Sequence, residues 1–172
     1  GPLFECARLG LGAFGILTAV TMRCVPAFAL HAVETPGRLG EALERFPDDM
    51  RDVDHPEFYW FPHTDRVLTK RNTRLPADTP LSPVGRVSSW IDDELVSNNA
   101  FELINRVTTR FPSIIPRVNT LSAAAWSGRT FTDRSSSVFA SARRVRFQEM
   151  EYAVPPESVP SVIRAIETWI AR

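Results

Sequence analysis

The first part of the chain contains a helical segment, a glycine-rich turn and two runs that favour strands. Residues 3–9 have helical character, and glycines then interrupt the chain over residues 10–15. Residues 16–25 are rich in apolar and β-branched side chains, and Pro26 stops that run. We therefore predict a strand over residues 16–25 and a second extended stretch over residues 28–34.

A helix and a hairpin are predicted next. Pro36-Gly37 favours a turn, apolar residues recur at helical spacing over 39–46, and Pro47 is expected to end that helix. Two β-prone runs, residues 57–61 and 66–71, flank a short segment of turn-forming residues. This pattern is typical of a β-hairpin.

The second half of the chain has fewer clear signals. Residues 72–90 are rich in proline and predict an irregular connection, whereas residues 92–110 have helical periodicity. Residues 111–142 have no clear pattern. Residues 143–154 alternate as a long strand does, and residues 159–170 form an amphipathic helical stripe.

This order of elements predicts an α+β fold in which an antiparallel sheet has helices on one face. Two strand–helix–strand halves would form the sheet. The second half has no closing strand after residues 159–170. We therefore expect the sheet to be incomplete at the C-terminal end of the chain.

Composition narrows the class of protein. The 172 residues are 44% hydrophobic and 23% charged, and 20 basic residues balance 20 acidic ones, which suits a soluble domain without an overall field for nucleic acid. The longest uncharged run, residues 9–22, is shorter than the roughly 20 residues that a membrane-spanning helix needs. We expect a cytoplasmic protein, with peripheral attachment to a membrane as the alternative, and no nucleic-acid partner.

The cysteines and histidines do not predict a metal site. Cys6 and Cys24 lie far apart without metal-ligand spacing, so we expect two buried free thiols. His31, His55 and His63 form no HxxxH pattern.

The run GLGAFG at residues 10–15 matches GxGxxG. In dinucleotide-binding folds this motif follows a strand and opens a helix whose N-terminus faces the pyrophosphate. Here the predicted helix precedes the glycines and the predicted strand follows them. Two interpretations remain: a helix-to-strand turn, or a stretch of backbone without side chains that approaches a flat cofactor closely.

Several other groups have both a structural and a functional interpretation. The aromatic run 58–61 resembles an RNA-binding sheet, but consecutive residues occupy both faces of a strand, so at least half of them must be core. Glu149 and Glu151 share a face of the predicted strand 143–154, and they could perform acid–base work or pair with arginines of a neighbouring strand. Two charged groups are most simply solvated: the basic Arg143, Arg144 and Arg146, and an acidic loop of Asp48, Asp49, Asp52 and Asp54.

Four segments carry a family resemblance: ARLGLGAFGILTAVT at 7–21, EFYWFPHTD at 57–65, VF with RRVRF within 138–147, and EMEYAVP at 149–155. In this order they resemble the aldonolactone oxidoreductases, the sugar-lactone members of the vanillyl-alcohol-oxidase type flavoproteins. The resemblance is strongest to actinobacterial gulono- and arabinono-lactone enzymes. Arginine supplies nearly all of the basic residues, with Lys70 as the one lysine, and this bias fits such a source.

The resemblance implies a flavoprotein of two domains. Residues 1–26 would be the C-terminal remnant of an FAD-binding domain, and residues 27–172 a ferredoxin-like cap domain for the substrate, incomplete at its C-terminus. The implied cofactor is FAD, with the backbone of Gly12, Gly15 and Ile16 beside the flavin. The implied reaction oxidises a sugar 1,4-lactone of the arabinono, gulono or galactono type by hydride transfer to flavin. Oxygen or another acceptor would then take the electrons.

Parts of the family pattern are missing from this sequence. The upstream flavin-binding segments, the Glu-x-Arg pair and the His-Trp-Gly-Lys segment do not occur, and Glu149-Met150-Glu151 has no arginine at its third place. The catalytic residues therefore stay unknown. We expect an FAD-binding domain as packing partner and no activity from this chain alone. The alternative is a non-catalytic α+β binding or interaction module.

Overall fold

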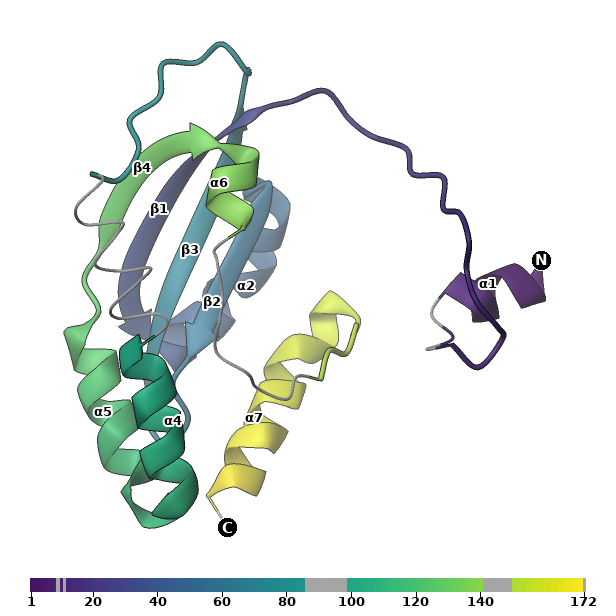
Figure 1. Ribbon diagram of the computed structural model, residues 1–172. Coiled ribbons are helices and arrows are strands. Elements are labelled where there is room, and N and C mark those ends of the chain that lie inside the picture. Colours follow the sequence, from purple (N-terminus) through teal and green to yellow (C-terminus); the bar gives the residue numbers. More distant parts are fainter. Residues whose placement is uncertain (9, 11, 86–98, 141–149, 172) are drawn as a thin grey trace.

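Four strands form one antiparallel sheet in the computed structural model (Figure 1). The structure describes residues 1–8, 10, 12–85, 99–140 and 150–171. The sheet has the order β2-β3-β1-β4, and all its pairs are antiparallel. Its strands are β1 (Ala29–Arg38), β2 (His55–Trp60), β3 (Arg66–Leu75) and β4 (Arg129–Arg134). The α+β prediction is confirmed, whereas the ferredoxin-like detail stays a prediction.

Helices connect and flank the strands. The described helices are α1 (Pro2–Arg8), α2 (Leu39–Asp52), α4 (Phe101–Arg110), α5 (Ile115–Ala125), α6 (Ser135–Phe139) and α7 (Val159–Ile170), with 3-10 turns η2 (Pro112–Ile114) and η3 (Pro156–Ser158). Within the described part of the chain, no helix combines the length and the apolar character needed to cross a membrane.

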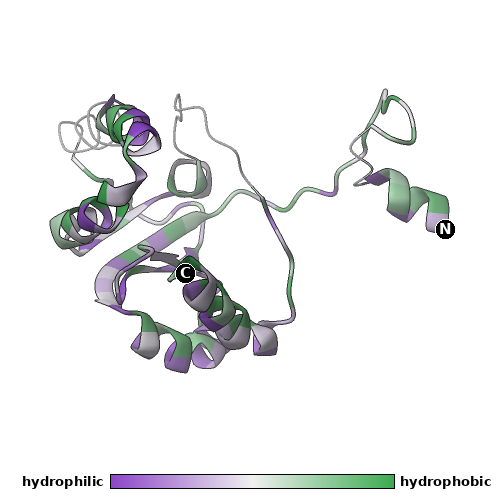
Figure 2. Cartoon of the chain, turned by 90° about the horizontal axis from the view of Figure 1, so that it is seen from below, coloured by the Kyte–Doolittle hydropathy of each residue, from purple (hydrophilic) through white to green (hydrophobic). Residues whose placement is uncertain are grey.

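The two faces of the sheet are packed differently. Leu39, Ala42 and Leu43 of α2 are buried against Val67 of β3, and α7 adds Val159 and Ile163 to the same cluster. We call this side the α2 face. Figure 2 shows α2 and α7 on the same side of the sheet. Because side chains alternate along a strand, Leu30 and Ala32 of β1 point to the other side, where Val138 of α6 covers them. We call that side the α6 face.

Two prolines stand inside regular elements rather than at their ends. The turn predicted at Pro36-Gly37 is wrong, because β1 continues to Arg38 with Pro36 opposite Leu68 and Gly37 opposite Val67. Pro47 does not end its helix either, because α2 continues to Asp52. Proline costs α2 one backbone hydrogen bond, and burial of the apolar stripe of α2 against the sheet offsets that loss.

The strand predicted over residues 16–25 is wrong. These residues have no regular structure, and the segment runs away from the sheet towards α1 (Figure 1). Ile16 is 92% exposed. Strand propensity mainly reflects packing against neighbours, and no described strand pairs with this segment. The prediction of buried thiols is also wrong: Cys6 of α1 and Cys24 of this segment are both exposed.

The acidic stretch after residue 47 is largely helical rather than a solvated loop. Asp48, Asp49 and Asp52 belong to α2, and the Asp49 carboxylate lies 3.2 Å from the Arg71 guanidinium of β3. The hydrogen bond from Arg51 to Asp48 raises the pKa of Arg51. Asp54 accepts a hydrogen bond from the backbone N–H of Arg74 at 2.8 Å. Asp49 and Asp54 therefore connect α2 and the residues after it to β3, whereas Asp48 and Asp52 are exposed and pair with Arg51 within α2.

The hairpin and the terminal helix are confirmed as β2–β3 and α7. The irregular connection after β3 bridges the outer edge of β4 through Ser82 and Thr132. Residues 150–154 of the predicted last strand have no regular structure, and Glu151 is exposed. Glu149, the arginine cluster at residues 143–146 and the acidic start of the predicted helix 92–110 lie outside the described residues.

Candidate functional site

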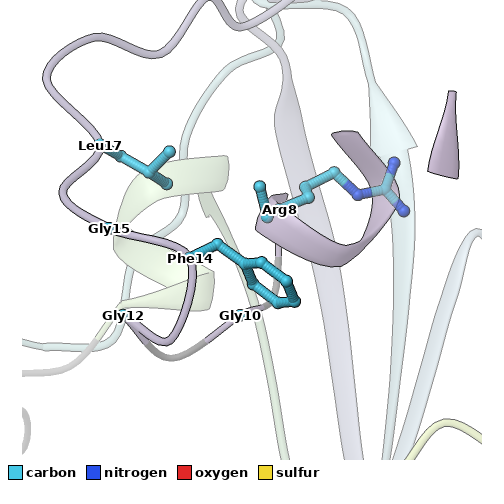
Figure 3. A pocket seen from close by; sticks show the side chains of 7 residues that line it. Arg8, Gly10, Gly12, Phe14, Gly15 and Leu17 are labelled. Atoms are coloured by element: carbon cyan, nitrogen blue, oxygen red, sulfur yellow. The ribbon is translucent and has the colours of Figure 1, made fainter. Parts of the chain in front are cut away.

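The glycine turn after α1 borders a cavity of about 320 Å³. Figure 3 shows the turn folding back towards α1, with the Phe14 ring between them. Gly12 and Gly15 line the cavity, and Ile16 is not among its lining residues. The place of these three residues beside a flavin stays a prediction. Lining residues are Ala7, Arg8, Gly10, Gly12, Phe14, Gly15 and Leu17.

Glycine is required in this turn for two different reasons. Gly12 and Gly15 have φ angles of +82° and +109°, which side chains of L-residues rarely allow. A Cβ at either position would meet nothing within 4 Å, so the space beside the backbone is open. At Gly10 a Cβ would lie 2.6 Å from the Phe14 ring and 2.9 Å from the Cys6 carbonyl oxygen. The turn therefore offers bare backbone that a flat ring can approach.

Substituting Gly15→Ala is expected to shift this turn away from its present geometry. A left-handed conformation costs a residue with a Cβ about 1–2 kcal/mol, which corresponds to a roughly tenfold smaller population of the turn. Backbone chemical shifts and the amide–Hα coupling of residue 15, measured by NMR, report the loss of positive φ. Gly40→Ala in α2 is the matched control, because a Cβ there meets nothing within 4 Å and alanine favours helix. An unchanged coupling pattern in Gly15→Ala would contradict the strain argument.

A second group of polar residues forms one row across the α6 face. Arg129 of β4 is opposite Glu34 of β1, Glu34 is opposite Lys70 of β3, and Lys70 is opposite Glu57 of β2. Partners in an antiparallel register point to the same side of a sheet. The four strands therefore carry a row of charges that alternates in sign, which we call the charge row.

Hydrogen bonds fix the charge row at both ends. The Arg129 Nε donates to Glu34 Oε2 at 2.5 Å, where the Glu34 side chain is 4% exposed and that of Arg129 39%. Lys70 is buried and its Nζ donates to the Val138 carbonyl at 3.1 Å, which ties α6 to the sheet. At the other end, the Tyr59 hydroxyl donates to Glu57 Oε2 at 2.7 Å.

Asn72 lies beside the charge row and is fully buried. Its Nδ2 donates to Glu57 Oε1 at 3.0 Å and to the His55 carbonyl at 3.2 Å. Its Oδ1 is buried without a hydrogen-bond partner. A buried acceptor left unpaired costs about 1–3 kcal/mol, so this atom lowers the stability that the surrounding hydrogen bonds provide.

An aromatic cluster fixes the point where the chain enters the sheet. The Arg74 guanidinium lies 4.5 Å from the centre of the Phe28 ring, and its Nε donates to His55 Nε2 at 3.0 Å. The His55 ring also stacks on Phe28 and contacts the edge of Phe139. The last residue before β1 is therefore anchored on the sheet, although residues 16–25 are not.

The charge row was not singled out from the sequence. The alternation of β3 carries part of the signal, because Lys70 and Asn72 are two positions apart and therefore share a face. The pairing of the strands is what brings Glu34, Glu57 and Arg129 into the same row. In the described ranges, no cluster of three or more histidine, cysteine or carboxylate side chains could hold a metal ion.

Comparison with known proteins agrees with the resemblance in the sequence. A family model described as D-arabinono-1,4-lactone oxidase matches residues 20–172. The whole chain is 36% identical to an L-gulono-1,4-lactone dehydrogenase of Mycobacterium tuberculosis and covers 40% of that protein. An L-gulonolactone oxidase of Scyliorhinus torazame is 32% identical over 69% of the chain and 26% of its own length. A D-arabinono-1,4-lactone oxidase of Yarrowia lipolytica is 25% identical over 98% of the chain and 33% of its own length.

The chain thus spans 40% or less of the length of these relatives. The family match nevertheless covers nearly all of the chain, including every strand of the sheet and the charge row. On this evidence, the chain belongs to the D-arabinono-1,4-lactone oxidase family, within the aldonolactone oxidoreductases.

Proposed function

We propose that this chain is the cap portion of an FAD-dependent oxidoreductase that oxidises a sugar 1,4-lactone. The observation that carries the proposal is the family match over residues 20–172. The relatives named above are lactone oxidases and dehydrogenases. The substrate would be a lactone of the arabinono, gulono or galactono type, and the electrons would pass to oxygen or another acceptor.

The glycine turn supports the proposed cofactor. Gly12 and Gly15 expose backbone to an open space, which suits close approach of a flat ring system. Together with the backbone of Ile16, they would form one wall of the flavin site. When bound, FAD supplies the acceptor for the hydride from the lactone ring carbon. The residues of this chain would hold and orient the cofactor and substrate, and we assign the proton-accepting base to none of them.

Exposed apolar side chains support a packing partner for residues 1–26. Large apolar surface left open in this way marks an interface. The exposed apolar residues of this segment are Leu3, Phe4, Phe14, Ile16, Leu17, Val20, Met22 and Val25. We propose that residues 1–26 belong to an FAD-binding domain and residues 27–172 to the cap. A self-sufficient binding module, the alternative, would bury these side chains against its own sheet.

A chimera tests this proposal. The chain would replace the matched region of the Mycobacterium tuberculosis relative, and the chimera would be given FAD and then L-gulono-1,4-lactone or D-arabinono-1,4-lactone. We expect it to retain yellow flavin and to bleach on addition of lactone. The isolated chain, mixed with FAD and passed through a gel-filtration column, is expected to retain less than one flavin per chain.

Two results would count against the proposal. Stoichiometric flavin on the isolated chain would contradict the division at residue 26. A chimera that holds FAD but stays oxidised with both lactones would contradict the proposed substrate class.

A further inference from the structure

We propose that the contact between His55 and Arg74 is a pH-sensitive anchor for the segment that enters the sheet. The anchor holds this segment when His55 is neutral and releases it when His55 is protonated. Phe28 is the last residue before β1, and residues 16–25 have no regular structure and run away from the sheet (Figure 1). The contact therefore lies where an irregular segment becomes part of the fold. The proposal depends on neither a cofactor nor a substrate.

The hydrogen bond between the two side chains defines the protonation state of His55. Arg74 Nε donates to His55 Nε2 at 3.0 Å. A guanidinium stays charged and can only donate, so Nε2 is the unprotonated nitrogen of a neutral imidazole. A proton on Nε2 turns this acceptor into a donor, and the contact then joins two cations. Imidazole is the side-chain group that ordinarily changes charge between about pH 5 and 8, so acidification breaks the contact.

The other charged groups near His55 do not replace the lost acceptor. Two carboxylates flank it on its own stretch of chain. Asp54 Oδ2 accepts from the backbone N–H of Arg74 at 2.8 Å, and Glu57 accepts two side-chain hydrogen bonds elsewhere on the sheet. From β1 and α6 only aromatic rings contact His55, and α6 has no charged residue. Both carboxylates favour positive charge nearby, but neither accepts the hydrogen bond that Arg74 Nε loses.

The same contacts hold Phe28 and α6 together. The Arg74 guanidinium lies 4.5 Å from the centre of the Phe28 ring. The His55 ring contacts Phe28 on one side and Phe139 of α6 on another. The Phe28 carbonyl accepts a hydrogen bond from the backbone N–H of Ser135, the first residue of α6, at 3.1 Å. When His55 and Arg74 separate, the Phe28 ring loses two of its contacts. The bond to Ser135 then opens more often, and the segment before Phe28 can change direction.

Hydrogen exchange of the Ser135 amide measures the anchor directly. Exchange in the ¹⁵N-labelled chain is followed by NMR at about pH 7.5 and about pH 5.5, on either side of the range in which imidazole titrates. Each rate is expressed as protection relative to an unstructured peptide at the same pH. We expect the protection of Ser135 to fall about tenfold at the lower pH, the effect of losing one hydrogen bond to a charged group. The Phe111 amide, which donates to the Val107 carbonyl at the end of α4, is the internal reference and should keep its protection.

Two variants assign the pH dependence to this contact. His55→Gln keeps an acceptor for Arg74 but cannot be protonated, so the protection of Ser135 should be equal at the two pH values. Arg74→Gln removes the cation that opposes a protonated His55. It also removes the contact with the Phe28 ring, so Ser135 should be less protected than in the unsubstituted chain, and equally so at both pH values.

The other two histidines supply matched controls. His31 Nδ1 lies 2.9 Å from Thr132 Oγ1 of β4, which makes His31 the nearest alternative source of a pH effect on Ser135. His63 is exposed in the turn between β2 and β3. His31→Gln and His63→Gln should each retain the tenfold change.

Three results would overturn this inference: equal protection of Ser135 at both pH values in the unsubstituted chain, a pH dependence that survives His55→Gln, or one that disappears in His31→Gln. If His55→Gln does not fold, a pH dependence that survives Arg74→Gln has the same meaning. The experiment contains neither flavin nor lactone, so its failure leaves the proposed function intact. A chimera that does not oxidise lactone likewise leaves the anchor intact.

Discussion

Replacing Leu30 with alanine is expected to lower the free energy of unfolding by about 3 kcal/mol. Leu30 is fully buried on the α6 face, where it packs with Ala32 and Val138 and contacts Phe28 and Phe131. Removal of the leucine side chain leaves a cavity, because the close-packed neighbours relax only partly into the space. A loss of this size is a large share of the 5–15 kcal/mol typical of a folded domain.

Urea unfolding followed by circular dichroism measures the effect, with Leu121→Ala as the matched control. Leu121 is 72% exposed in α5, and alanine is a good helix former, so this variant should stay within about 0.5 kcal/mol of the unsubstituted chain. Equal losses in the two variants would show that the apolar cluster beneath α6 does not carry the stability assigned to it.

Substituting Arg129→Met is expected to cost about 3 kcal/mol of unfolding free energy, at the low end for breaking a buried pair. The Glu34 carboxylate is almost completely buried, and Arg129 is its closest cationic partner at 2.5 Å. The Arg129 side chain is partly exposed, so losing its own contacts costs little unfolding free energy. Most of the cost comes from the buried Glu34 carboxylate, which is left without its cationic partner. Glu34→Gln should accordingly cost less, about 1 kcal/mol, because Arg129 can be solvated when its partner is neutral.

Urea unfolding of the two single variants and of the double variant gives the coupling between these side chains. Arg106→Met in α4 is the control, since Arg106 and Glu102 also lie 2.5 Å apart but both side chains are exposed. An exposed pair of this kind contributes about 0.3–0.5 kcal/mol. If Arg129→Met cost no more than Arg106→Met, the Glu34–Arg129 contact would be a surface pair and not part of a buried row.

Local pattern was sufficient for the elements whose stability is mainly local. The hairpin β2–β3 follows from two β-prone runs around turn-forming residues, and α7 follows from its apolar stripe. The order of these elements was enough for the α+β class, and four short segments were enough for the family. Each of these inferences depends only on residues that are close together in the sequence. Periodicity and short motifs are patterns of such residues, so they are sufficient.

Tertiary contacts decided the rest. Pro36 continues a strand and Pro47 continues a helix, because pairing with β3 and burial against the sheet outweigh the local preference of proline. Residues 16–25 have strong strand propensity but no strand, since a strand needs a partner to satisfy its backbone. Glu34, Glu57, Lys70 and Arg129 are ordinary charged residues in the sequence. Antiparallel register makes them one row, because it places residues far apart in the chain at matching heights on one face.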